Sequence, residues 1–207
     1  MEKFAVTIGR SYGSRGSEIG IRLAERLGIP FYDKEIIEEQ VKKSGFTSEY
    51  IKSFDEKRTS SLLYSIFMNP ESIMLQSGFG QTQPVDLAIQ KVQIETIREI
   101  ASQGPCVIVG RRADKILKDS HETLSIFFTA EDKDRVAFVA KKEDLKEKEA
   151  ENKIGRMDRS RRSYYNYFGD GAWGEASNYD LCINTSKISE DTAIEMIMTC
   201  LKSRGLV

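Results

Sequence analysis

Five short apolar stretches, separated by longer helical sequence, constrain the fold of this chain more than any other feature. They comprise residues 4–9, 29–33, 105–110, 124–130 and 179–184. Strands of a parallel sheet are buried on both faces, so they read as continuous apolar runs without an apolar–polar alternation. Their alternation with helices predicts an α/β fold with a parallel five-stranded sheet between two layers of helices.

The segments between the strands predict a single domain over residues 1–207, a length that suits one domain. Helices are expected within 17–28, 34–45, 85–104, 132–167 and 190–203. Gly28 stands at the stop position of the first helix, and Ser189 is expected to cap the last one. Two segments, 46–84 and 141–178, interrupt this plan and are interpreted as appendages of the domain.

The charge balance argues against several partner classes. The formal net charge is −1 and the pI is about 6.0, which gives no overall attraction to nucleic acid or to an anionic membrane. Residues 1–3 run directly into strand-like sequence, and no apolar run approaches the roughly 20 residues of a membrane span. We therefore expect a cytoplasmic protein with neither nucleic acid nor membrane as a partner.

The three cysteines, Cys106, Cys182 and Cys200, are scattered and form no C-x-x-C motif. Each lies in an apolar stretch, so buried reduced thiols are expected in preference to disulfides, metal ligands or a nucleophile. No paired metal-ligand spacing occurs in the sequence, so a metal ion is expected to be Mg²⁺ held by Ser17, water and phosphates.

The segment GRSYGSRGSEIG, residues 9–20, joins the first strand to the first helix. Glycines at such a turn allow positive φ angles and let a phosphate approach the backbone amides. Ser17 occupies the Ser/Thr position of a G-x-x-x-x-G-K-[ST] phosphate loop, but Gly16 stands at the lysine and Arg10 at the first glycine. The sequence therefore favours phosphate binding, with a turn that only packs as the alternative.

Arg10 and Arg15 bring positive charge to this segment. Arg15 is adjacent to the missing lysine, and its planar guanidinium suits phosphate well. Arg15 is the predicted substitute for the lysine, although its side chain leaves the backbone one residue earlier.

Three segments, 12–37, 107–117 and 158–191, resemble the cytidylate kinase-like family of P-loop nucleoside monophosphate kinases. The resemblance is to a divergent branch that lacks the loop lysine. It implies a three-layer α/β/α domain of P-loop NTPase type with a segment that grips the monophosphate and a lid that closes over ATP. The implied reaction moves the γ-phosphoryl group of ATP, with Mg²⁺, to a nucleoside monophosphate of (d)CMP type.

The family pattern also implies roles for residues of the loop. Cofactor binding falls to Gly13, Ser14, Arg15, Gly16 and Ser17, and Ser17 is the implied ligand of Mg²⁺. The unmatched segment 46–84 is then a candidate substrate-binding insertion or flap, and 141–178 is a candidate lid.

On the acceptor side, the Gly-Arg turn makes Arg111 the implied contact to the substrate phosphate, with Arg112 beside it. Asp33 either contacts the sugar or caps the next helix, and Asp114 either contacts a ligand or caps a helix. Glu39 stands where cytidylate kinases carry a phosphate-binding arginine, which argues against cytidine monophosphate.

The candidate lid contains the basic segment KIGRMDRSRR, residues 153–162. Asp158 and Arg161 match the D-x-x-R pattern of the family's lid, and Arg156 is a further implied contact to ATP. Arg161, Arg15 and Arg111 are thereby the expected catalytic residues. The aromatic segment 163–174 either stacks on a base or anchors the lid to the core.

Three functions remain open from the sequence. The first is an ATP-dependent kinase acting on a nucleotide or another small phosphate-bearing ligand. The second is a kinase-shaped module that binds a nucleotide without turnover, suggested by the missing lysine. The third is a self-associating scaffold, in which the apolar residues 60–74 form a subunit interface, for instance of a homodimer.

Overall fold

The computed structural model describes residues 3–43, 83–167 and 171–207. Most of the predicted flap, residues 46–82, and the whole apolar segment 60–74 lie outside the described residues. The predictions made for these two segments therefore stay predictions.

The described strands form one sheet of five parallel strands in the order β2-β3-β1-β4-β5. The strands are β1 (Phe4–Arg10), β2 (Phe31–Tyr32), β3 (Cys106–Val109), β4 (Glu122–Thr129) and β5 (Leu181–Asn184). Each lies in or next to one of the five predicted apolar stretches, so the predicted parallel α/β fold is confirmed. β1 is central, with β3 on one side and β4 on the other.

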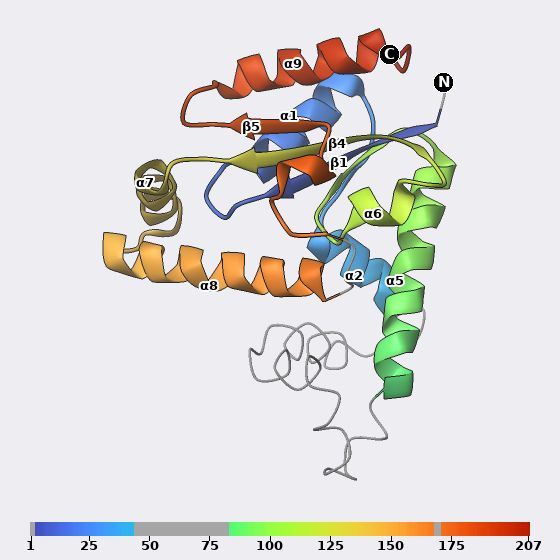
Figure 1. Cartoon of the computed structure of the whole chain (residues 1–207), viewed down its shortest axis with the longest axis horizontal. Helices are drawn as coiled ribbons and strands as arrows, with labels where there is room; N and C mark the ends of the chain where they lie inside the picture. The colour runs from blue at the N-terminus through green and yellow to red at the C-terminus, as the bar shows by residue number, and fades with distance from the viewer. Residues whose placement is uncertain (1–2, 44–82, 168–170) are drawn as a thin grey trace.

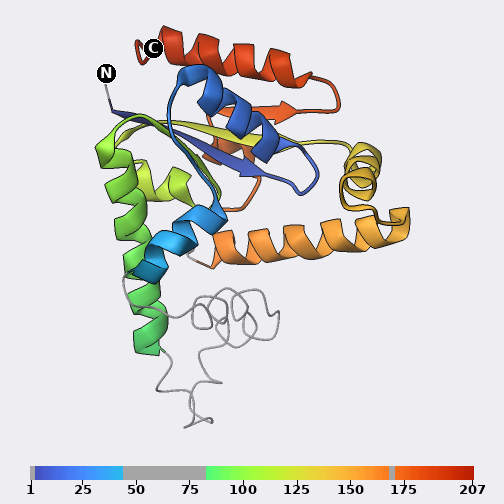
Figure 2. The ribbon, with the colours of Figure 1, turned by 180° about the vertical axis from the view of Figure 1, so that it is seen from behind.

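Helices cover both faces of this sheet (Figures 1 and 2). They are α1 (Gly16–Leu27), α2 (Lys34–Lys43), α5 (Gln83–Gln103), α6 (Ala113–Leu117), α7 (Asp132–Glu143), α8 (Glu147–Asn166) and α9 (Glu190–Ser203), with a short 3-10 helix, η2 (Ala176–Asn178). One apolar layer joins α1 and α9 to the sheet, for example through Leu23 and Ile197. The other joins α2, α5 and α6 to the opposite face, for example through Ile37, Ile97 and Leu117.

Two predicted helix ends are confirmed. Gly28 follows α1 in the left-handed conformation with φ 65°, as a glycine C-cap does. Ser189 caps α9, because its hydroxyl accepts a hydrogen bond from the Thr192 amide at 3.2 Å.

The charged helical segment predicted over 132–167 is divided into α7 and α8. Asp144 ends α7 in the left-handed conformation with φ 53°, and the side chain of Glu149 accepts from the Lys146 amide at 2.9 Å at the start of α8. The two helices pack on each other through Val139, Ala150 and other apolar residues. The two helices therefore form a helical hairpin, and of the candidate lid, 141–178, this hairpin contains α8 and the last residues of α7.

The cysteine prediction is only partly right. Cys106 is buried in β3, and burial raises the pKa of its thiol to about 11, so it stays protonated. Cys182 is exposed on the edge strand β5, although its neighbour Ile183 is buried, and Cys200 on α9 is partly buried. All three thiols are free.

Candidate functional site

The glycine-rich segment 9–20, here called the loop, leaves the carboxyl end of β1 and enters α1. Ser11 donates its amide to the Phe128 carbonyl at 2.9 Å, which anchors the loop to β4. The buried Ser14 hydroxyl donates to the Ser11 carbonyl at 2.8 Å, and the Thr185 hydroxyl donates to the Ser14 carbonyl at 3.0 Å. These bonds hold the loop in one conformation before any ligand arrives.

Two residues of the loop have positive φ angles. Gly13 has φ 81°, as the glycine pattern predicts, but the second is Arg15, with φ 61°, and not Gly16. Gly16 is needed for space, because a Cβ atom there would lie 2.9 Å from Cβ of Arg10 and 3.0 Å from Phe128. The position at which phosphate loops carry lysine is thus closed to any side chain in this packing.

A cavity of about 120 Å³, here called the loop cavity, lies between the loop and α7. Its lining includes Gly13, Arg15 and Ser17 from the loop and Phe138 and Lys142 from α7. The loop also presents the amino end of α1, where backbone amides favour an anion. This cavity therefore has the composition of an anion site.

Arg15 lies at the rim of the loop cavity. Its side chain is 47% exposed, forms an ion pair with Glu190 at 3.3 Å and lies over the Phe138 ring at 4.9 Å. Lys142 on α7 pairs with Glu18 of α1. Both cations of the rim are thus engaged with carboxylates in the described structure.

A larger cavity of about 480 Å³, here called the sheet cavity, opens at the carboxyl ends of β1, β2 and β3. Ligands of parallel α/β sheets bind at this edge. Its polar and aromatic lining comprises Thr7, Arg10, Tyr12, Ser17, Asp33, Lys34, Glu35, Arg111, Arg112, Asp114, Ser160, Arg161, Tyr164, Tyr165, Trp173 and Tyr179.

Arg111 and Arg112 follow β3 and are both buried, at 7% and 8% exposed. Both residues have left-handed backbone angles, which turns the chain sharply at the mouth of the cavity. Arg111 forms an ion pair with Glu38 of α2 and lies 5.1 Å from the Tyr164 ring centroid. Arginines placed in this way are not ordinary surface charges.

The two carboxylates of the sheet cavity are held by the protein. Asp33 caps α2, because its Oδ1 accepts from the Ile36 amide at 3.0 Å. Asp114 accepts from the Tyr165 hydroxyl at 2.6 Å, and burial raises the pKa of Asp114 above its ordinary value. Glu39 is exposed and lines neither of the two cavities, whereas its neighbour Glu38 reaches Arg111.

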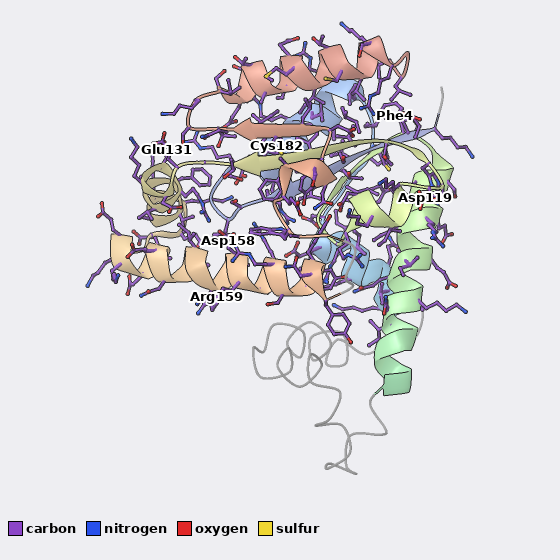
Figure 3. All side chains as sticks on the ribbon, viewed as in Figure 1. Phe4, Asp119, Glu131, Asp158, Arg159 and Cys182 are labelled. Atoms are coloured by element: carbon purple, nitrogen blue, oxygen red, sulfur yellow. The ribbon has the colours of Figure 1, made fainter. Side chains whose placement is uncertain are left out.

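Helix α8 contacts the loop through Asp158. Its Oδ1 accepts the Tyr12 amide at 2.7 Å, and its Oδ2 forms an ion pair with Arg135 of α7. Arg135 in turn donates Nε to the Tyr12 carbonyl at 2.8 Å. Figure 3 shows Asp158 on the side of α8 that faces the sheet and Arg159 on the opposite side.

Arg161 lies on the same inner side of α8. It donates Nη1 to the Arg10 carbonyl at 3.0 Å and lies 5.1 Å from the Tyr12 ring centroid. Burial lowers the pKa of Arg161, so its charge is poorly solvated. Arg156, by contrast, is exposed and lines neither cavity.

The aromatic residues at the end of α8 and beyond it have different roles. Tyr164 and Tyr165, in the last turn of α8, line the sheet cavity, while Trp173 packs edge-to-face on Phe127 with centroids 5.4 Å apart. Trp173 also lines the cavity. The segment therefore both anchors the helical hairpin to the sheet and supplies cavity wall.

Arg10 is the site residue that the sequence prediction left without a role. It is the last residue of β1, and its buried Nε has no hydrogen-bond partner among the described residues. Burial and the nearby Arg161 lower the pKa of Arg10 to about 9. The available signal was an arginine directly after the first predicted strand, at the position where the phosphate-loop pattern has its first glycine.

The two cavities share part of their lining. Arg10, Tyr12, Ser17 and Arg161 border both of them. Two cavities with arginine in their lining thus meet at Arg10, Arg161 and Ser17. That arrangement suits the transfer of an anionic group from one bound molecule to another.

Comparison with known proteins identifies the family of this chain. Residues 5–187 match the model of the Cytidylate kinase-like family. The chain belongs to this family. A cytidylate kinase from Pyrococcus horikoshii is 26% identical over 97% of this chain and 89% of its own length. One from Methanopyrus kandleri is also 26% identical, over 95% of this chain and 92% of its own.

Solved structures agree on the fold of this family member. An uncharacterised protein from Eubacterium ventriosum has a TM-score of 0.73 and 28% identity, with 97% of this chain and 99% of that chain covered. Shikimate kinase from Acinetobacter baumannii, in complex with shikimate, has a TM-score of 0.50 and 14% identity, covering 100% and 97% of the two chains. The shikimate kinase likeness concerns the fold alone, whereas the family and its cytidylate kinase relatives support a nucleotide kinase function.

No helix among the described residues is long and apolar enough to cross a membrane. Within the same ranges, no group of three or more His, Cys, Asp or Glu side chains could hold a metal ion.

Proposed function

We propose that this protein transfers the γ-phosphoryl group of ATP to a nucleoside monophosphate, with a (d)CMP-like acceptor as the first candidate. The observation that carries the proposal is the junction of the two cavities at Arg10, Tyr12, Ser17 and Arg161. A donor in one cavity and an acceptor in the other would bring the reacting phosphates together at this junction. Family membership supports the same reaction class.

On the donor side, the loop would hold the ATP phosphates through the amides of residues 13–17 at the amino end of α1. The Ser17 hydroxyl borders both cavities and makes no hydrogen bond to a described residue, so it fits a ligand of Mg²⁺. When bound, Mg²⁺ would neutralise phosphate charge. Arg15 is the further cation that we assign to ATP, whereas Arg156, predicted from the sequence to contact ATP, is exposed, lines neither cavity and is given no contact.

On the acceptor side, Arg111 would bind the phosphate of the monophosphate, with Arg112 next to it. The Glu38 carboxylate fixes the Arg111 guanidinium from behind, which orients it before the substrate binds. Asp33 lines the same cavity near the sugar position implied by the family. Tyr164 and Tyr165 supply aromatic wall against which a base can stack.

In this reaction the protein forms no covalent bond to the substrate and acts mainly by binding and orienting it. Phosphoryl transfer depends mainly on position and on stabilisation of the charge that spreads over the equatorial oxygens. Arg161, at the junction, is placed to meet that charge from the helical hairpin. Asp33 is the one carboxylate that we name as a candidate proton acceptor for the nucleophile.

A second function is favoured by one observation. The lysine position is occupied by Gly16, in space closed by Arg10. Loss of one donor aimed at a developing charge typically costs about 100- to 1,000-fold in rate. A module that binds a nucleotide or phosphate without turnover is therefore the alternative to the kinase.

The test combines binding and product analysis. Calorimetric titration with Mg·ATP should be followed, in the same sample, by chromatography after addition of CMP, dCMP, UMP, AMP or GMP. We expect ADP together with a nucleoside diphosphate, and weaker ATP binding in Ser17→Ala by about tenfold. Binding without any diphosphate product would favour the alternative. If the protein neither binds Mg·ATP nor forms a product, both proposed functions are contradicted.

Arg111→Gln is expected to raise the KM for the acceptor by about 10- to 100-fold, because one charged hydrogen-bonding group to its phosphate is lost. The KM for ATP should change by less than about threefold. Steady-state kinetics with each substrate varied separately measures both. A larger effect on ATP than on the acceptor would contradict the assignment of Arg111.

A further inference from the structure

We propose that Arg10 replaces the lysine of the phosphate loop and contacts the phosphoryl group at the junction of the two cavities. This inference rests on the proposed function and names a residue that the loop pattern does not include. Four observations carry it: the position of Arg10, its lack of a partner, the closed space at Gly16, and the cations around it.

The first observation is position. The Arg10 side chain starts at the end of the central strand and extends toward the carboxyl end of β3, where a Cβ atom on Gly110 would overlap Nη1 of Arg10. Arg10 borders both the loop cavity and the sheet cavity. A guanidinium at that point can reach a group on either side of the junction.

The second observation is the missing partner. No carboxylate forms an ion pair with Arg10, and its buried Nε has no hydrogen-bond partner, among the described residues. Buried charges are ordinarily paired, because an unpaired one loses its hydration without compensation. By contrast, Arg15 already pairs with Glu190, and Arg111 with Glu38. Arg10 is therefore the cation of this group that most needs an external anion.

The third observation is the coupling between positions 10 and 16. A Cβ atom at Gly16 would lie 2.9 Å from Cβ of Arg10, so a lysine at position 16 and an arginine at position 10 exclude each other in this packing. The usual loop has a glycine at the first position and a lysine at the second. This chain has the opposite arrangement, and the positive charge has moved from the helix start to the strand end.

The fourth observation is the local field. Arg161 and Arg111 lie near enough to disfavour the charge on Arg10, while Glu35 and Asp33 favour it less strongly. The arginines around Arg10 thus form a cluster of positive charge that a polyphosphate would neutralise. Two planar guanidinium groups, Arg10 and Arg161, can each form paired hydrogen bonds to phosphate oxygens.

The first experiment compares Arg10→Gln with Arg26→Gln. Arg26 lies on α1, pairs with Glu195 at the surface and lines neither cavity, so it controls for loss of an arginine. We expect Arg10→Gln to lower kcat by about 100- to 1,000-fold and to weaken calorimetric binding of inorganic tripolyphosphate by about 10- to 100-fold. Arg26→Gln should match the wild type in both.

A third variant and a thermal measurement guard against a folding defect. Arg10→Lys keeps the charge and should retain tripolyphosphate affinity within about tenfold of the wild type. Because Arg10 has no ion-pair partner among the described residues and its Nε is buried without a hydrogen bond, Arg10→Gln should unfold about 2–4 °C higher than the wild type without ligand. Tripolyphosphate should then stabilise the wild type more than the variant.

The outcomes separate this inference from the proposed reaction. If Arg10→Gln retains wild-type turnover and tripolyphosphate affinity, the role of Arg10 is overturned while the kinase proposal stands. In a second outcome, the wild type binds tripolyphosphate through Arg10 and forms no diphosphate with any acceptor. In that case the role of Arg10 in phosphate binding stands, and the proposed kinase function is contradicted. A wild type that binds no tripolyphosphate overturns the inference outright.

The exchange between the two positions has its own test. Gly16→Lys alone should lose activity, because its Cβ meets Arg10, and Arg10→Gly alone should lose the charge. Arg10→Gly/Gly16→Lys should regain at least about tenfold in kcat over Arg10→Gly, with Phe128 shifting by a few tenths of an ångström. A folded double variant no more active than Arg10→Gly would overturn the exchange.

Discussion

Replacing Asp158 by alanine is expected to lower the free energy of unfolding by about 3 kcal/mol. The carboxylate holds the Tyr12 amide and the Arg135 guanidinium, and its side chain is only 16% exposed. Its removal leaves a buried arginine with one fewer counter-charge and a loop amide without its acceptor. Breaking a buried ion pair from one side typically costs about 3–5 kcal/mol. Urea denaturation followed by circular dichroism measures the change.

Asp132 provides a matched control for this prediction. It pairs with the same Arg135, at 2.9 Å, but its side chain is 89% exposed. Exposed pairs contribute about 0–1 kcal/mol, so Asp132→Ala should change stability by no more than that. Equal losses in the two variants would show that Asp158 does not hold the hairpin to the loop.

Replacing Arg161 by methionine is expected to lower kcat by about 100- to 1,000-fold while the KM for each substrate changes much less. On the proposed function, Arg161 acts on charge that develops only during transfer, so its loss should fall on kcat. The comparison variant is Arg159→Met, on the exposed side of the same helix (Figure 3). Steady-state kinetics of both variants distinguishes loss of the Arg161 side chain from the cavity from a disturbance of α8 that either substitution would cause.

A loss confined to KM would show that Arg161 binds ground-state ligand only. Comparable losses in Arg161→Met and Arg159→Met would instead attribute the effect to the helix. Arg161 also donates a hydrogen bond to the Arg10 carbonyl, and this bond is lost in Arg161→Met. The thermal unfolding midpoint of this variant should therefore be measured alongside its kinetics. A midpoint within about 3 °C of the wild type would keep the kinetic interpretation clear.

The sheet could be predicted because buried parallel strands are defined by local composition. The first predicted strand, 4–9, differs from β1 by one residue, and 105–110 contains β3. The division of 132–167 could not be predicted in the same way. It depends on Asp144 in a left-handed conformation, which a non-glycine residue adopts only in a supportive context.

The site was predictable in its parts but not in its connections. Arg111 and Ser17 come shortly after predicted strands, and the carboxyl ends of parallel strands lie at one edge of the sheet. Both residues therefore line the sheet cavity at that edge. The contact between Asp158 and Tyr12 joins residues 146 positions apart, and no local pattern encodes it. The position of Arg10 likewise depends on a distant residue, because Gly110, 100 positions along the chain, leaves space that the Arg10 side chain occupies.

The strand order has a consequence for how this family can diversify. β1 separates β3 and β2, whose ends border the sheet cavity, from β4, which leads into α7 and the loop cavity. On the proposed function, substitutions after β2 and β3 would alter the acceptor while leaving the nucleotide donor bound as before. New acceptor preferences could then evolve by small steps, each through an active ancestor, because the two halves of the reaction are encoded on opposite sides of one strand.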